Sequence, residues 1–179
     1  MTKRIAFLRA VNLGKRKVAN ARLVEVFDEL GFPGATTFVN SGNVVFDATG
    51  SRGDLERKIG DAIEADVGFE VTTYVRTVAE VRKALALEPF EMEAGDTWFV
   101  TFFTDPLTKA EAKGIEALSG DFDTLEVHGR DVHWLMKGKS SDSKLTKRDW
   151  EKVLGKTPGR AGTSRNTTML RRLLAKIDA

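Results

Sequence analysis

Short stretches of alternating hydrophobic and polar residues are separated in the first half of the chain by stretches with helical spacing. Alternation predicts strands over residues 3–11, 35–40, 43–48 and 69–76, and apolar residues three or four apart predict helices over residues 20–30 and from Ser51 onward. The Ser41-Gly42 pair supplies the turn of a hairpin between the second and third strands. The resulting order, β-α-β-β-α-β, predicts a ferredoxin-like, split βαββαβ subdomain.

We expect the first and third strands of this subdomain to be neighbours and to run parallel. On that expectation, the polar loop of residues 12–17 lies at the opposite end of the sheet from the turn at residues 41–43. The end of the first strand then neighbours the end of the third, near Phe46 and Asp47. The segment Ser41-Gly42-Asn43 is interpreted mainly as turn chemistry.

The second half of the chain repeats part of this layout. The same patterns predict a strand over residues 98–104, a helix over 108–118, a hairpin of 124–128 with 132–137, a helix over 143–154, and a last helix over 167–177. A loop at residues 155–165 and the last helix stand where a fourth strand would be. We therefore predict an α+β fold: a ferredoxin-like subdomain at residues 1–77, a connecting helix and acidic loop at 78–96, and a degenerate βαββα-type subdomain with a C-terminal helix at 97–179. One compact domain overall remains the alternative.

Four motifs spread along the chain resemble those of one family. They are Leu8-Arg9-Ala10-Val11-Asn12-Leu13-Gly14-Lys15, Ser41-Gly42-Asn43-Val44-Val45-Phe46, Val75-Arg76-Thr77, and Thr163-Ser164-Arg165-Asn166. Together they resemble the bacterial family catalogued as domain of unknown function 1697. The resemblance implies a two-subdomain α+β fold and no established reaction, substrate or catalytic residue. Ala10 and Lys15 replace glycines usual in the family, which argues against a close backbone approach to a ligand there, and Thr167 replaces a common tryptophan.

Charge is segregated along the chain. Residues 1–22 carry +7, residues 23–129 carry −13 and residues 130–179 carry +8, although the net charge is only +2. If the two ends of the chain meet in space, they form a basic face. The composition, 41% hydrophobic and 30% charged, argues against a disordered chain. The chain has no cysteine and no long apolar run, which predicts a cytoplasmic protein without a membrane partner.

Two loops are candidates for binding an anion. The first, at residues 12–17, links a strand to a helix, and the second, at residues 156–165, ends at a helix N-terminus. The candidate ligand-binding residues are Arg9, Asn12, Lys15, Arg16, Lys17, Arg160, Arg165 and Asn166. Arg9 interrupts an apolar strand, so we expect it to be largely buried and paired. Neither loop has the spacing of a phosphate-binding Walker motif.

Other chemistry is not indicated. His128 and His133 flank a turn without a third ligand, so no metal is assigned. No pattern singles out catalytic residues or a cofactor, and whether the protein is an enzyme is left open. The leading hypothesis is binding of an anionic partner, nucleic acid or a phosphorylated metabolite, on a basic face formed by both chain ends. The alternatives are an enzyme acting on a phosphorylated small molecule at the subdomain junction, with Arg9, Lys15 and Arg165 as clamps, and a protein-interaction module using the acidic middle segment. The oligomeric state is not predicted.

Overall fold

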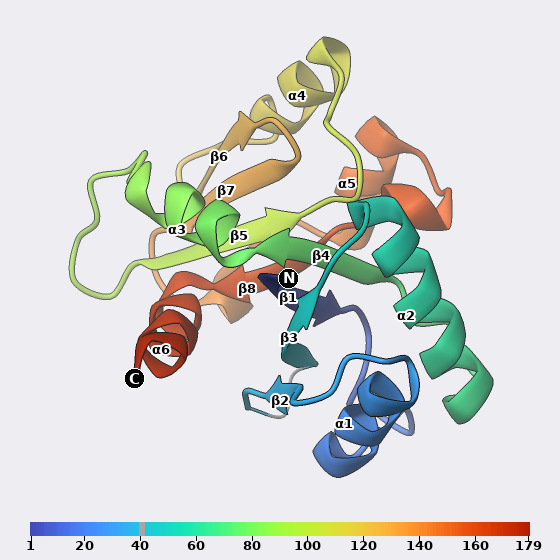
Figure 1. Cartoon of the computed structure of the whole chain (residues 1–179). Helices are drawn as coiled ribbons and strands as arrows, with labels where there is room; N and C mark the ends of the chain where they lie inside the picture. Colours follow the sequence, from blue (N-terminus) through green and yellow to red (C-terminus); the bar gives the residue numbers. More distant parts are fainter. Residues whose placement is uncertain (40–41) are drawn as a thin grey trace. The chain divides into compact units, whose positions relative to one another are not determined.

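The first sheet is arranged around the apolar strand β1 (Thr2–Leu8), which pairs on both sides (Figure 1). The computed structural model describes residues 1–39 and 42–179. The remaining elements of the first half are α1 (Asn20–Glu29), β2 (Thr36–Thr37), β3 (Asn43–Ala48), α2 (Arg52–Val67), β4 (Thr73–Thr77) and α3 (Val78–Ala86). The strand order is β2-β3-β1-β4, the order of a ferredoxin-like sheet.

β1 and β3 are neighbours, but they run antiparallel, with Phe7 opposite Asn43 and Thr2 opposite Ala48. The expectation of parallel strands was wrong. The hairpin between β2 and β3 reverses the chain, so β3 returns against the direction of β1. The predicted second strand is shorter than expected, since β2 ends at Thr37, and residue 40 lies outside the described residues.

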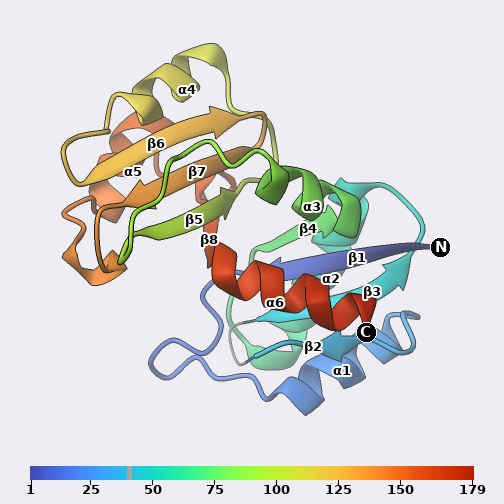
Figure 2. The ribbon, with the colours of Figure 1, turned by 90° about the vertical axis from the view of Figure 1, so that its left-hand side faces the viewer.

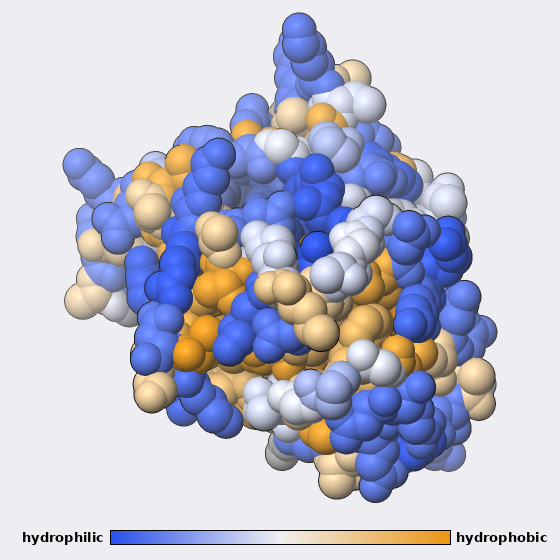
Figure 3. Space-filling view, in the orientation of Figure 1, coloured by the Kyte–Doolittle hydropathy of each residue, from blue (hydrophilic) through white to orange (hydrophobic). Residues whose placement is uncertain are grey.

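Two helices cover one face of the first sheet (Figure 2). α1 contributes Leu23, Val26 and Phe27, and α2 contributes Leu55, Ile59 and Ile63 to a core shared with the strands. These residues recur at helical spacing, so each helix has one apolar face. The opposite sides of α1 and α2 are hydrophilic in the space-filling view (Figure 3).

The second half contains β5 (Thr97–Phe102), α4 (Lys109–Glu116), β6 (Asp123–His128), β7 (Asp131–Met136), α5 (Lys147–Leu154), β8 (Thr163–Asn166) and α6 (Thr167–Asp178). Its sheet has the order β6-β7-β5-β8, and α4 and α5 cover one of its faces. The predicted α+β fold and the C-terminal helix are confirmed, but the fourth strand of this half was missed. β8 is a complete fourth strand, paired with β5, so the second half also has the split βαββαβ order.

The chain divides into two compact units, Met1–Val81 and Arg82–Ala179, and the boundary falls within α3. Both units are α+β, with the same strand order. Among the described residues, no helix is both long and apolar enough to cross a membrane.

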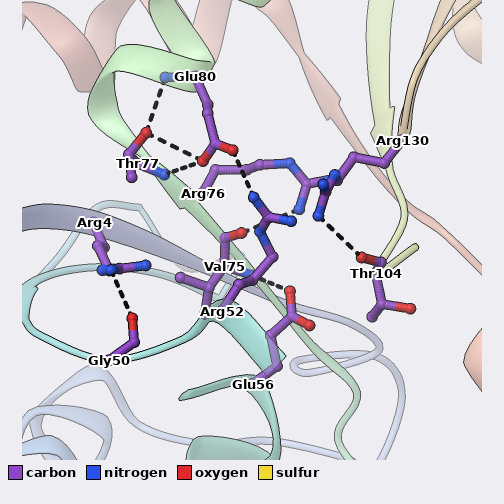
Figure 4. Close-up of polar contacts among 10 residues, drawn as sticks. All are labelled: Arg4, Gly50, Arg52, Glu56, Val75, Arg76, Thr77, Glu80, Thr104 and Arg130. Carbon is purple, nitrogen blue, oxygen red and sulfur yellow. Dashed lines mark hydrogen bonds and ion pairs between the residues drawn. The ribbon is translucent and has the colours of Figure 1, made fainter. Parts of the chain in front are cut away.

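The two units place an arginine at the same position of the fourth strand. Arg76 lies opposite Ile5 of β1, and Arg165 lies opposite Val100 of β5. Arg76 is 1% exposed and donates from Nη1 to the carbonyl of Val75 at 3.1 Å (Figure 4). Arg165 is 9% exposed and donates from Nη1 to the carbonyl of Ser164 at 3.0 Å. Each guanidinium thus hydrogen-bonds the carbonyl of the residue before it on an edge strand.

Side chains also occupy the outward N–H groups of edge strands. The N–H of Val75 donates to Glu56 at 2.9 Å, and that of Thr77 donates to Glu80 at 2.7 Å (Figure 4). In the second unit, the N–H of Val127 donates to Glu116 at 2.9 Å. Edge strands with unpaired N–H groups invite another chain to pair with them, so these carboxylates protect β4 and β6.

Truncating Arg76 should destabilise the protein more than replacing it with an apolar side chain of similar length. We expect Arg76→Ala to lower the free energy of unfolding by about 3 kcal/mol, because it removes the buried volume as well as the polar contacts. Arg76→Met, which keeps most of the volume, should cost about 1–2 kcal/mol. Urea denaturation measures both. The control Arg57→Ala, at a side chain that is 70% exposed, should change stability by less than about 0.5 kcal/mol. Equal losses for Ala and Met would contradict this account.

Candidate functional site

Three chain segments meet where β1 ends. The N–H of Leu8 donates to the carbonyl of Gly42 at 2.8 Å, and the N–H of Arg9 donates to the carbonyl of Thr72 at 2.9 Å. The loop after β1 and the turn before β3 therefore lie at the same end of the sheet, not at opposite ends as expected from the sequence. Phe46 and Asp47 lie at the other end, opposite Arg4 and Lys3.

The turn before β3 requires a glycine. Gly42 has a φ of +72°, and a Cβ atom at this position would lie 2.4 Å from Cγ2 of Val11 and 3.0 Å from Cβ of Leu8. Asn43 closes the same turn, since its Nδ2 donates to the carbonyl of Phe38 at 3.1 Å while its side chain is buried. The turn is thus packed directly against the start of the loop after β1.

Backbone strain is concentrated at this end. Among the described residues, four other than glycine have a positive φ, and three of them are Ala10 (60°), Asn12 (60°) and Val39 (52°). A side chain in this region costs roughly 1–3 kcal/mol, and such residues cluster at binding and catalytic sites. The strain marks this end of the first unit as a candidate site.

The loop at residues 9–19 is fixed at its base and exposed at its tip. Val11 and Val18 are buried in the core, and the N–H of Val18 donates to Oδ1 of Asn12 at 3.1 Å. At the tip, the N–H of Arg16 donates to the carbonyl of Leu13 at 2.9 Å. Leu13 is 63% exposed there. We call residues 12–18 the basic loop.

The basic loop presents cations that are not neutralised within the first unit. Lys15, Arg16 and Lys17 are exposed, and none of them has an ion pair with a residue that the structure describes. The guanidinium of Arg16 lies over the ring of Phe69, with Cζ 5.3 Å from the ring centroid. Arg22, by contrast, is surrounded by acids.

The segments beside the basic loop add little negative charge. Residues 9–19 and 36–39 contain no acidic residue, and residues 68–73 contain only Glu70. Helix α1 begins directly after the loop. Its N-cap is Ala19, which has no side-chain group to cap the helix. The positive end of the helix dipole therefore reinforces the positive potential of the loop.

Arg9 does not occupy the buried strand position expected from the sequence. β1 ends at Leu8, and the left-handed Ala10 turns the chain away, so Arg9 is only half-buried. Its guanidinium has no ion pair with any described residue. The buried arginines of the fold are Arg76 and Arg165 instead.

The three candidates of the second loop have structural contacts inside the second unit. Arg160 forms an ion pair with Glu111 of α4. The N–H of Thr108, together with this arginine, holds the pKa of the Glu111 carboxyl below its usual range. Arg165 is buried, and its Nη1 also donates to Oγ1 of Thr163 at 2.7 Å. Asn166 caps α6, with Oδ1 accepting from the N–H of Thr168 at 2.8 Å. These contacts leave the basic loop as the better candidate for an anionic ligand.

The two histidines pack against each other, with ring centroids 5.2 Å apart. His128 contacts Glu126 at 2.6 Å, and the buried His133 accepts on Nδ1 from the indole N–H of Trp98 at 3.2 Å. Burial, and to a lesser extent His128, lower the pKa of His133 to about 4. Within the described part of the chain, no group of three or more His, Cys, Asp or Glu side chains could hold a metal ion.

The sequence did not identify Phe69 and Thr72 as members of this site. Both come from the segment that precedes β4, more than fifty residues from the basic loop. The strand topology could have indicated them. Because β4 runs antiparallel to β1, the segment that precedes β4 lies at the end of β1.

Residues 1–133 match the model of a family described as "Protein of unknown function (DUF1697)". The chain belongs to this family. The DUF1697 match extends from the first unit into the second and includes the basic loop and the turn at Gly42. Among curated proteins, none is similar enough to be counted as a relative.

A solved structure is similar along the whole chain. It is described as the structure of conserved bacterial protein SP0830 from Streptococcus pneumoniae, with 21% sequence identity and a TM-score of 0.73 over 100% of this chain and 99% of that one. At this identity the similarity shows a shared fold.

Adding a methyl group at Gly42 should separate the cost of close packing from the cost of the backbone conformation. We expect Gly42→Ala to lower the free energy of unfolding by about 3 kcal/mol, because it adds a steric clash to a left-handed conformation. The control is Gly34→Ala, at a φ of +80° with no atom within 4 Å of the new Cβ, which should cost about 1 kcal/mol. Chemical denaturation gives both values. Equal losses would show that Val11 moves aside without cost.

His133 should make the stability of the protein depend on pH between its two pKa values. Its pKa falls from 6.5 to about 4 in the folded protein, so the unfolded chain takes up the proton first as the pH decreases. The contribution of His133 to the free energy of unfolding is complete above pH 6.5 and is lost as the pH falls towards 4. The total loss is at most about 3 kcal/mol. His133→Gln should flatten this part of the profile, whereas His128→Gln should leave most of it. Urea denaturation at a series of pH values measures the slope, and an unchanged slope in His133→Gln would contradict the assignment.

Proposed function

We propose that this protein binds a nucleic acid through its phosphates, and that the basic loop and Arg9 form the binding surface. The proposal keeps the anionic partner expected from the sequence and assigns it to the first unit. Arg160, Arg165 and Asn166 are not included, because each of them has a structural contact in the second unit.

The observation that carries the proposal is the difference between equivalent loops of the two units. Eleven residues, 9–19, connect β1 to α1, whereas six residues, 103–108, connect β5 to α4. The shorter loop makes the contact that corresponds to the hydrogen bond from Leu8 to Gly42 in the first unit. Here the N–H of Phe103 donates to the carbonyl of Arg130 at 2.9 Å. The shorter loop has no Lys or Arg. A strand–helix connection of this fold therefore needs neither the length nor the charge of the connection at residues 9–19. Long loops on a rigid fold often carry the residues of a binding or catalytic site.

The charge arrangement suits a phosphate backbone. Three consecutive cations, Lys15, Arg16 and Lys17, are exposed at a tip whose base is fixed by buried valines. Exposed cations that form no ion pair within the protein can bind the phosphates of a nucleic acid. This binding is favourable because it releases the counterions condensed on the nucleic acid. The buried side chains of Val11 and Val18 and the hydrogen bond from the N–H of Val18 to Asn12 fix the base of the loop, which lowers the entropy lost on binding.

Binding should depend steeply on salt and on the charge of the loop. With about three phosphates neutralised, the logarithm of the affinity for a single strand should fall with a slope near −2 against the logarithm of salt concentration. The double variant Lys15→Glu/Lys17→Glu should weaken binding at least about tenfold at low salt and bring the slope closer to zero than about −1. Fluorescence anisotropy with a labelled 12-mer measures both.

The matched control is Lys139→Glu/Lys144→Glu, which makes the same change in net charge at exposed lysines of the second unit. It should keep at least half of the wild-type affinity. Absence of binding to oligonucleotides and to polyphosphate at low salt would contradict the proposed function. Tight binding of a small phosphate compound that is insensitive to salt would favour a phosphorylated metabolite instead.

A further inference from the structure

The guanidinium of Arg16 lies over an aromatic ring and is still accessible to solvent. Its guanidinium lies 5.3 Å above the ring centroid of Phe69, and Arg16 is nonetheless exposed. Phe69 itself packs against the core of the first unit, which fixes the ring. A cation–π contact with a fixed ring favours one position of the arginine, and an exposed guanidinium offers a planar surface on which a base can stack.

An apolar side chain lies within the same tight turn. Leu13 accepts from the N–H of Arg16 through its carbonyl, and it is one of the few large hydrophobic side chains that are exposed among the described residues. A purely electrostatic contact with phosphates has no use for such a residue. The tip of the basic loop therefore combines cations, an exposed guanidinium plane and an aliphatic side chain.

We infer that the partner is a single-stranded nucleic acid, with one base stacked on the outer face of Arg16 and in contact with Leu13, while Lys15 and Lys17 contact the flanking phosphates. This inference rests on the proposed function. Unpaired bases expose flat apolar faces that stack on aromatic rings or on arginine planes, and stacking of this kind tolerates any sequence. A duplex hides these faces and presents phosphates alone to a surface loop.

The decisive variant is Arg16→Lys, which keeps the charge and removes the plane. We expect it to weaken binding of a single-stranded 12-mer about fivefold. Its affinity for polyphosphate, and for an abasic strand of the same length, should stay within about twofold. Leu13→Ser should follow the same pattern. Arg148→Lys, at an exposed arginine of α5, is the control and should bind all three probes like the wild type.

The outcomes separate the inference from the proposed function. Equal binding of the 12-mer and of a matched duplex, or equal loss of 12-mer and polyphosphate binding in Arg16→Lys, overturns base stacking and leaves phosphate binding intact. If no polyanion binds, both fail together. Binding to anionic lipid vesicles that is abolished by Leu13→Ser, without preference for the single strand, overturns the inference in favour of a membrane surface.

Discussion

The antiparallel pairing of β1 with β3 and β4 determines what lies at the candidate site. Because both neighbours run against β1, the point where β1 ends is the point where β3 and β4 begin. The chain segments that precede those strands, around Gly42 and Thr72, are thereby brought to the loop that follows β1. The absent side chain of Gly42 then lets Val11 pack against the turn. The position of the basic loop and the proximity of Phe69 both follow from this pairing.

Most elements of the fold could be predicted from periodicity, because apolar faces must be buried and each element has a characteristic repeat. The direction of β3 is not encoded in any single residue, because it follows from the hairpin that reverses the chain between β2 and β3. β8 was missed because Thr163, Ser164, Arg165 and Asn166 contain no apolar residue. The inward-facing residues of β8 are Thr163 and Arg165. Both can be buried because they hydrogen-bond each other.

The candidate site could be predicted only where local sequence was sufficient. A run of Lys15, Arg16 and Lys17 between a strand and a helix is visible in the sequence, and the structure places it in an exposed loop. Local sequence also indicates Asn166 as an N-cap, because asparagine before a helix is a preferred capping residue. The ion pair of Arg160 with Glu111 and the stacking of Arg16 on Phe69 join residues about fifty positions apart. Such contacts depend on tertiary packing, so the sequence could not distinguish the cations used within the fold from those left free.

The repetition of one topology within the chain separates what the fold requires from what has been added to it. The buried arginine of the fourth strand occurs in both units and makes the same backbone contact, so it belongs to the requirements of the fold. The connection at residues 9–19, which contains the basic loop, is longer than its counterpart in the second unit and places Ala10 and Asn12 in left-handed conformations. Natural sequences keep locally unfavourable conformations mainly where function offsets their cost. The asymmetry between the loops therefore supports binding at the first unit, while the second unit shows how the same connection is made without it.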